Sequence, residues 1–364
     1  MSMRGLGHRL YSGEVSFDVI GRRKTWYLVS AILLIISIGA LGFRGLNLGI
    51  EFRGGSDFAV PNATCSVEDA RSAAEAQTGQ QAIVTATGSG TIRVQTEALT
   101  PAETTAMTEV LGSTCGVSAG DIKVQVVGPT WGSEISKKAL QGLVIFLLLV
   151  ALFLSLYFEW RMALAALVAL AHDLLITIGI YALTGLEVTP ATVIGLLTIL
   201  GYSLYDTVVV FDKVKENTKG ISGQSQRTYS EAANLAVNQT LVRSINTSIV
   251  ALLPVMAIIV IGAGILGAST LLDLAVALAI GMATGAYSSI FIAPPFLCQL
   301  KELQPEMKSL AARVRARRGQ ATRDGADAVV AGTPDEARRA PAPVVSAGPR
   351  TQPKKAARSK RGKR

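Results

Sequence analysis

Four charged positions lie within long apolar segments of this 364-residue sequence. They are Asp173, which follows His172, together with Asp206, Arg243 and Asp273. An uncompensated charge in hydrocarbon costs several kcal/mol, so charged residues at membrane depth usually pair, line an ion path or carry protons. These residues therefore favour a membrane protein in which a buried carboxyl group gains and loses a proton.

The segments around these residues are long enough to cross a membrane. A spanning helix needs roughly 20 mostly apolar residues, and six segments qualify, at residues 25–43, 138–158, 162–184, 190–211, 239–261 and 271–293. The chain is 49% hydrophobic and 17% charged, with a mean hydropathy of +0.40, which excludes an ordinary soluble protein. The first segment follows basic residues as a signal peptide does, but no small-x-small cleavage site follows it, so we expect an uncleaved anchor.

The distribution of lysine and arginine predicts the orientation in the membrane. Basic residues precede the first span and lie between the fourth and fifth spans, whereas the turns at 185–188 and 262–269 contain none. Both termini are therefore expected in the cytoplasm. Five regions follow: a cytoplasmic segment at 1–24, the first span at 25–43, an extracytoplasmic α+β domain at 44–137, a five-helix bundle at 138–300 and a cytoplasmic tail at 301–364.

The extracytoplasmic region has the pattern of a small folded domain. Alternating residues predict strands at 56–60, 81–86, 91–96 and 121–127. Helices are predicted at 66–78, with Ser66 as N-cap, and at 100–112, opened by Thr100 and Pro101. The order β-α-β-β-α-β predicts a ferredoxin-like fold.

Two cysteines lie at the ends of these predicted helices. Cys65 begins the first helix and Cys115 follows the second. The two helices of a ferredoxin-like unit lie side by side, and an extracytoplasmic compartment permits disulfides. A Cys65–Cys115 disulfide is therefore predicted, with two unpaired thiols as the alternative, whereas Cys298 is expected to be packed in the last span.

The basic charge is concentrated in the tail. Residues 301–364 contain 17 Lys and Arg against 6 Asp and Glu, a net charge of +11, whereas the first 300 residues have 18 against 20, a net charge of −2. The body is therefore not a nucleic-acid binder by charge. The tail composition predicts disorder. It would either attract anionic lipid or ribosomal RNA, or serve as a solvated segment that sets topology.

Helical geometry places Asp206 and Arg243 at a similar depth. Asp206 lies about 9 Å inside the cytoplasmic boundary marked by Asp212, and Arg243 lies roughly 7 Å inside the fifth span. Each is the other's most obvious counter-charge. The pair is either a static structural ion pair or a switch that opens when Asp206 takes up a proton.

Polar side chains recur at helical spacing near these charges, which predicts faces turned toward a bundle interior or water. They are Tyr202 and Ser203 in the fourth span, Asn246 and Thr247 in the fifth and Asp273 at the start of the sixth. In the third span, His172 would either relay protons to Asp173 or pack as a hydrogen-bonded histidine.

No cofactor or metal is predicted, and the chain is not expected to be an enzyme. Two histidines give no metal-ligand spacing, and no glycine-rich phosphate loop provides a nucleotide energy source. An intramembrane aspartyl protease with Asp173 and Asp206 as its dyad is an alternative. It lacks a Gly-x-Gly-Asp motif, and Arg243 would keep one carboxylate ionised, which suits shared-proton chemistry badly.

Several motifs, in order along the chain, resemble those of one family. They are SFDVIGRRK (16–24), NLGIEFRGG (47–55), VGPTWGSEI (127–135), ALAHDLLITIGIYALTG (169–185), GYSLYDTVVVFDKVKEN (201–217), VNQTLVRSINTS (237–248) and LDLAVALAIGMATGAYSSIFIAPP (272–295). Over residues 15–300 the chain resembles the SecF-type members of the SecD/SecF family of bacterial protein-export membrane proteins, which belongs to the RND superfamily. Tyr205 departs from the Asn that is common in the family, and residues 220–226 resemble an insertion.

The resemblance implies a six-span half-transporter of the bacterial plasma membrane, with a SecD protein as its other half. Such a complex uses the proton motive force to promote late steps of translocation through the SecYEG channel, while SecA supplies the ATP-driven work and a YajC-type subunit is a further partner. The extracytoplasmic domain would bind the exported unfolded polypeptide, and Asp206 and Arg243, with Asp173 and His172, would occupy the proton-coupling positions. The alternatives are half of another RND exporter of lipid or small molecules, and a passive scaffold for a partner.

Overall fold

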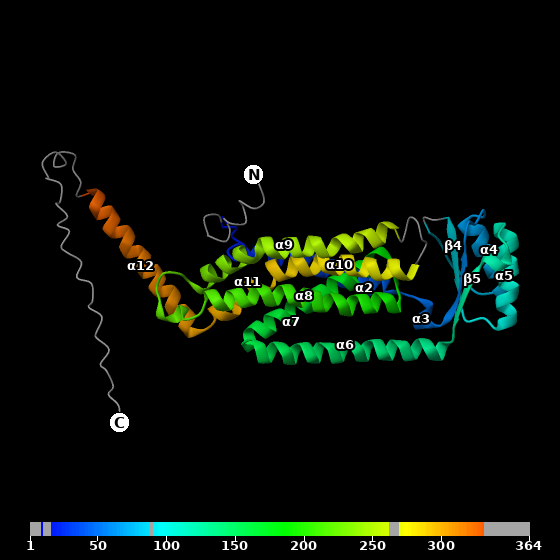
Figure 1. Cartoon of the computed structure of the whole chain (residues 1–364), viewed down its shortest axis with the longest axis horizontal. Helices are drawn as coiled ribbons and strands as arrows, with labels where there is room; N and C mark the ends of the chain where they lie inside the picture. The colour runs from blue at the N-terminus through cyan, green and yellow to red at the C-terminus, as the bar shows by residue number, and fades with distance from the viewer. Residues whose placement is uncertain (1–8, 10–15, 88–89, 262–268, 331–364) are drawn as a thin grey trace, which may run out of the picture. The chain divides into compact units, whose positions relative to one another are not determined.

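The computed structural model describes residue 9 and residues 16–87, 90–261 and 269–330. Within this part of the chain, six helices are long and apolar enough to cross a membrane, which confirms the predicted spans. They are α2 (Arg23–Arg44), α6 (Pro129–Tyr157), α7 (Trp160–Thr184), α8 (Pro190–Asn217), α9 (Tyr229–Ile261) and α10 (Ser269–Phe291) (Figure 1). The predicted turn at 262–269 falls almost entirely outside the described residues.

The start of α8 is fixed by local sequence. Thr189 is the N-cap, its hydroxyl accepts from the backbone N–H of Thr192, and the Thr192 hydroxyl accepts in return from the Thr189 N–H. Pro190 stands at the first helical position, where a missing N–H costs nothing. This cap sets the depth at which the later residues of α8 lie.

Small residues bring α8 and α10 into close contact. Gly285 of α10 lies so near α8 that a Cβ placed on it would be 2.8 Å from the Cβ of Ser203. A Cβ on Gly195 of α8 would likewise lie 2.9 Å from the Cβ of Ala277. The two helices run side by side in Figure 1. Close approach of this kind, typical of membrane helices, allows short polar side chains to reach from one helix to the next.

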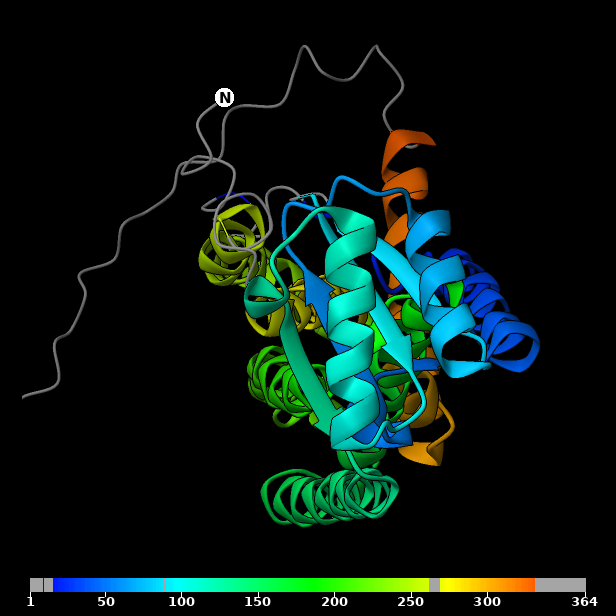
Figure 2. The ribbon, with the colours of Figure 1, turned by 90° about the vertical axis from the view of Figure 1, so that its right-hand side faces the viewer.

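The α+β domain confirms the predicted ferredoxin-like fold. Its elements are β2 (Gly55–Val60), α4 (Val67–Thr78), β3 (Ile83–Thr87), β4 (Thr91–Thr96), α5 (Pro101–Cys115), the 3₁₀ turn η1 (Ala119–Asp121) and β5 (Lys123–Val127). The strands pair antiparallel in the order β3-β4-β2-β5. Both helices cover one face of the sheet (Figure 2), with Phe58, Val94 and Leu111 fully buried between the layers.

Both domain helices begin with a capping box. Ser66 and Thr100 are the N-caps, and the Asp69 and Glu103 carboxylates accept hydrogen bonds from the backbone N–H and the hydroxyl of these caps. Hydrogen bonds to the ionised form lower the pKa of both carboxyl groups.

The caps predict a loss of helix stability in acid. Because the folded-state pKa of Asp69 and Glu103 is lowered, their stabilisation is complete above the ordinary carboxyl pKa of about 4 and is lost as the pH falls through the folded-state values. Amide exchange in the first turns of α4 and α5, corrected for intrinsic rates, should therefore quicken below pH 4 or so. The Asp69→Asn, Glu103→Gln protein should lack this pH response, and an identical response in both proteins would refute the prediction.

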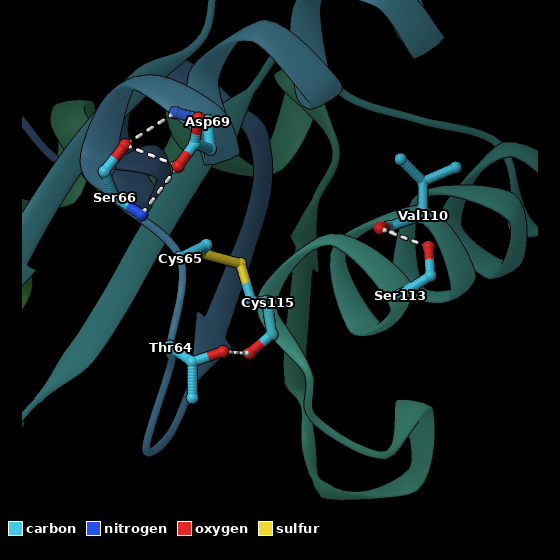
Figure 3. Close-up of a disulfide and its surroundings, with 7 residues drawn as sticks. All are labelled: Thr64, Cys65, Ser66, Asp69, Val110, Ser113 and Cys115. Carbon is cyan, nitrogen blue, oxygen red and sulfur yellow. Dashed lines mark hydrogen bonds between the residues drawn. A yellow bond between two sulfur atoms is a disulfide. The ribbon is translucent and has the colours of Figure 1, made fainter.

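A disulfide joins Cys65 to Cys115, the pairing that the sequence predicts, with 4.5 Å between the Cα atoms. It ties the residue before the α4 cap to the last residue of α5 (Figure 3). The Thr64 hydroxyl donates to the Cys115 carbonyl at 2.9 Å beside it. Cys298, by contrast, is a free and buried thiol.

Removing the disulfide should destabilise the α+β domain. Its cysteines are 50 residues apart, and closing a loop of that length stabilises the folded state by about 4 kcal/mol in the chain-entropy account. The Cys65→Ser, Cys115→Ser protein should lose amide protection in α4 and α5 at lower urea than the parent. Reductant should lower the parent's midpoint and leave that of the variant unchanged; equal midpoints in both proteins without reductant would contradict the prediction.

A short parallel pair that the sequence does not predict connects the domain to the bundle. Strand β1 (Asn47–Leu48) follows α2 and pairs with β6 (Glu187–Val188), which lies between α7 and α8. The one-turn helix α3 (Ile50–Arg53) follows β1 and leads into β2. The turn at 185–188 is therefore also a point of attachment for the domain.

The end of the described chain corrects the prediction of a disordered tail. Helix α11 (Ala293–Glu302) is followed by α12 (Pro305–Val330), so the first part of the tail is helical. Pro305 opens α12 and Glu306 lies in its first turn, and the alanine and arginine that follow have high helix propensity. Residues 331–364 lie outside the described residues.

The loop between α8 and α9 contains the 3₁₀ turn η2 (Ile221–Gly223).

Candidate functional site

Asp173 is held at the centre of the bundle by hydroxyl groups from two other helices. It lies on α7 and is 1% exposed. Its Oδ2 accepts from the Oγ of Ser203 on α8 at 2.5 Å and from the Oγ of Ser288 on α10 at 2.8 Å. A buried carboxyl group is thus hydrogen-bonded without a lysine or arginine partner among the described residues.

Asp206 repeats this arrangement with different helices. It lies on α8 and is 5% exposed. Its Oδ1 accepts from the Oγ of Ser244 on α9 at 2.7 Å, and its Oδ2 from the Oγ of Ser289 on α10 at 2.9 Å. The two carboxyl sites adjoin, because Ser288 and Ser289 are consecutive residues of α10.

Hydroxyl partners suit a carboxyl group that changes its protonation state. A hydroxyl can donate to a carboxylate, and it can rotate to accept from a carboxylic acid. An unpaired carboxylate at membrane depth is costly, and these hydroxyl groups supply hydrogen bonds to both aspartates. No pattern in the sequence singles out Ser244 or Ser289 as a partner of Asp206; they stand only next to Arg243 and Ser288 in the chain.

His172 lies against the first site. Its Nδ1 is 3.2 Å from the Asp173 Oδ1, and its ring lies 6.1 Å from that of Tyr287. Its Nε2 is buried and has no hydrogen-bond partner among the described residues. The histidine is thus both packed and in contact with a carboxyl group, so the geometry permits a proton relay without requiring one.

The predicted ion pair between Asp206 and Arg243 is wrong for this structure. The Arg243 guanidinium donates to the Tyr205 hydroxyl at 3.3 Å and lies at the exposed surface of the bundle. The expected common depth is right, since Tyr205 precedes Asp206. The direction is wrong because consecutive helical residues point about 100° apart: Ser244 faces Asp206, so Arg243 cannot face it as well.

The other predicted polar residues divide between two places. Tyr202 donates to the Thr247 carbonyl at 3.1 Å, and this contact joins α8 to α9 near the carboxyl sites. Asn246 is exposed on the same side as Arg243. Asp273 lies at the opposite end of α10 from Ser289, about 24 Å away along the helix axis, so it does not belong to the carboxyl sites.

No group of three or more potential metal ligands occurs in the described ranges.

The described fold and site define a class: a polytopic α-helical membrane protein with two buried carboxyl groups and a ferredoxin-like domain. Comparison with known proteins is more specific. Residues 107–303 match the family model described as protein export membrane protein SecD/SecF, C-terminal, and residues 39–56 match the SecD/SecF GG motif.

Curated relatives agree with the family match. The chain is 51% identical over 357 residues to protein translocase subunit SecF of Streptomyces coelicolor, covering 96% of this chain and 94% of the relative. It is 43% identical over 338 residues to protein translocase subunit SecF of Mycobacterium tuberculosis, covering 88% of this chain and 76% of the relative. The chain therefore belongs to the SecD/SecF family of bacterial protein-export membrane proteins.

A solved structure shares the fold. The crystal structure of SecDF, a translocon-associated membrane protein from Thermus thermophilus, superposes with a TM-score of 0.70 at 29% identity and covers 79% of this chain. This chain spans 39% of that solved chain. The fold is thus of the RND half-transporter type.

Proposed function

We propose that this chain is the SecF half of a SecD–SecF complex that uses the proton motive force to promote late steps of protein translocation through the SecYEG channel. One observation supports this above the others: the hydrogen bonds of buried Asp206 come from Ser244 and Ser289, and no lysine or arginine of the described residues forms an ion pair with it. Its hydroxyl partners can bind either protonation state. A proton-driven cycle requires a group of this kind.

Arg243 acts in this proposal as the charge that changes partners. It lies one residue from Ser244 and is exposed beside Tyr205, which is 52% exposed. A charge on the surface of a membrane-spanning helix needs a polar partner, and the SecD half would provide it by packing on this surface. When Asp206 loses its proton, the new negative charge attracts Arg243, and α9 turns so that Arg243 replaces Ser244 beside Asp206. When a proton returns, α9 turns back and Arg243 returns to the SecD side.

The gradient provides enough free energy to drive such a change. Moving one charge through 100 mV is worth about 2.3 kcal/mol, which biases a conformational equilibrium that lies within a few kcal/mol of balance.

With both termini in the cytoplasm, the α+β domain is extracytoplasmic and meets the exported unfolded polypeptide. SecA would provide the ATP-driven steps, and a YajC-type subunit would join the complex.

A reconstituted export assay tests the proposed function. The chain should co-purify with its SecD partner, and the complex in vesicles with SecYEG and SecA should increase the yield of translocated protein when a proton gradient is imposed. A protonophore added at saturating ATP should remove this increase. An increase that persists with the protonophore would refute the proposal and indicate a passive scaffold.

A further inference from the structure

The α+β domain is joined to the bundle by charged and polar side chains that the carboxyl sites do not use. We call this group the junction cluster. Its members are Glu51 on α3, Asp57 on β2, Arg93 and Gln95 on β4, Glu187 on β6 and Asp273 at the start of α10.

Strand β4 holds the cluster together. The Arg93 guanidinium forms ion pairs with Asp57 and, at 3.0 Å, with Glu187. The Gln95 Nε2 donates to the Glu187 Oε1 at 2.8 Å and to the Asp57 Oδ2 at 3.3 Å. Two side chains of the domain sheet therefore bind a carboxylate on the turn between the membrane helices α7 and α8.

Two buried carboxyl oxygens in the cluster have no hydrogen-bond partner among the described residues. One is the Oδ1 of Asp57, a residue only 6% exposed, and the other is the Oε2 of Glu51. The Glu51 Oε2 and the Glu187 Oε1 both lie close to Gly49: a Cβ on Gly49 would be 2.6 Å from the first and 3.0 Å from the second. Unpartnered buried carboxylate oxygens are costly, and like charges at one site favour protonation of one of them.

The charged groups around the cluster do not offset the cost of its unpartnered carboxylate oxygens. Asp273 adds a fourth carboxyl group, which interacts electrostatically with Glu187, Glu51 and Arg93. The nearby basic groups Arg44 and Arg53 are exposed and donate to the main-chain oxygens of Leu183 and Leu46, and Lys123 on β5 is exposed. Among the described residues, Arg93 alone forms ion pairs within the cluster.

We propose that the junction cluster is a second proton-binding site, which holds the α+β domain on the α7–α8 turn when it is protonated from the extracytoplasmic side. The proton comes from bulk water and binds one of the carboxyl groups of Glu51, Asp57 and Glu187. Arg93 then keeps its carboxylate partners while the repulsion falls. Loss of the proton to water restores the repulsion and releases the domain from the turn.

The position of Glu187 gives this site access to the helices of the carboxyl sites. Glu187 lies between α7, which carries Asp173, and α8, which carries Asp206. It is two residues before Thr189, the N-cap of α8. The inference rests on the proposed function only in this respect, that release of the domain would form part of the export cycle.

Spin-label distances in the full-length chain, in complex with SecD in lipid nanodiscs, test the inference. Labels on the Glu109→Cys and Thr184→Cys substitutions report the separation of α5 from the end of α7, because Cys298 is buried and the other cysteines are bonded. We expect the ratio of docked to released distances to be about tenfold higher near pH 5.5 than near pH 7.5. In the Glu51→Gln and Asp57→Asn proteins the α+β domain should stay docked at both pH values. In the Arg93→Gln protein it should be released at both. Glu68→Gln, on an exposed part of α4, should respond as the parent does.

The outcomes separate the two proposals. Equal distances at both pH values in the parent, or a parent-like response in both Glu51→Gln and Asp57→Asn, would overturn the proton site. Either result would leave the export role of Asp206 unaffected. A normal junction response together with gradient-independent export would overturn the proposed function alone.

Discussion

Replacing Asp206 by asparagine is expected to abolish the gradient-dependent part of protein export and to leave assembly with SecD intact. Asparagine has nearly the same shape: its Oδ1 can accept from one of Ser244 and Ser289 and its Nδ2 can donate to the hydroxyl oxygen of the other. The bundle should therefore keep its packing. It cannot take up a proton. The lost driving force is about 2.3 kcal/mol per 100 mV, or roughly fiftyfold in the equilibrium between the two states.

A matched control lies on the same helix. Asp212 is an exposed carboxylate of α8, six residues beyond Asp206. Asp212→Asn removes the same charge outside the buried site, and it should export at the parental rate in the same vesicles. The account fails if Asp206→Asn still responds to the gradient, or if both substitutions reduce export equally.

Replacing Gly285 by valine should disrupt the packing of α10 against α8. The added Cβ would lie 2.8 Å from the Cβ of Ser203, so α10 must move away from α8. Overpacking of this kind costs about 1–3 kcal/mol. The movement would also separate Asp173 from Ser203 on one side and Ser288 on the other, so both thermal stability and gradient-dependent export should fall.

Gly142 of α6 provides the comparison for this substitution. A Cβ on Gly142 has no atom of the described chain within 4 Å, so Gly142→Val adds the same side chain to a membrane helix without a clash. The thermal midpoint of the purified complex should fall for Gly285→Val and stay near the parental value for Gly142→Val. Equal midpoints in the two variants would show that the α8–α10 contact is looser than the structure indicates.

Local sequence rules predicted the parts of the fold that depend on near neighbours. Ser66 and Thr100 begin helices as expected, because a capping box needs residues only three positions apart. The β1–β6 pair was not predicted, because it joins two-residue strands far apart in the chain and has no periodicity to detect. The helical start of the tail was missed because a basic, alanine-rich segment satisfies both helix propensity and the composition of disorder.

At the carboxyl sites, too, some features could be predicted from the sequence and others could not. The cost of burying a charge was enough to single out Asp173 and Asp206 from the sequence. Their partners were not predictable from depth, because depth fixes the height of a residue and leaves the rotation of its helix open. That rotation turns Ser244, and not Arg243, toward Asp206. The choice between adjacent residues becomes visible only when the helices are packed.

The most direct test is whether Asp206 itself takes up the proton. Infrared difference spectra of the SecD–SecF complex between acidic and alkaline buffer report the protonation of buried carboxyl groups. We expect a carboxylic-acid band that is present in the parent and in Asp212→Asn and absent from Asp206→Asn. The same band in all three proteins would contradict the account.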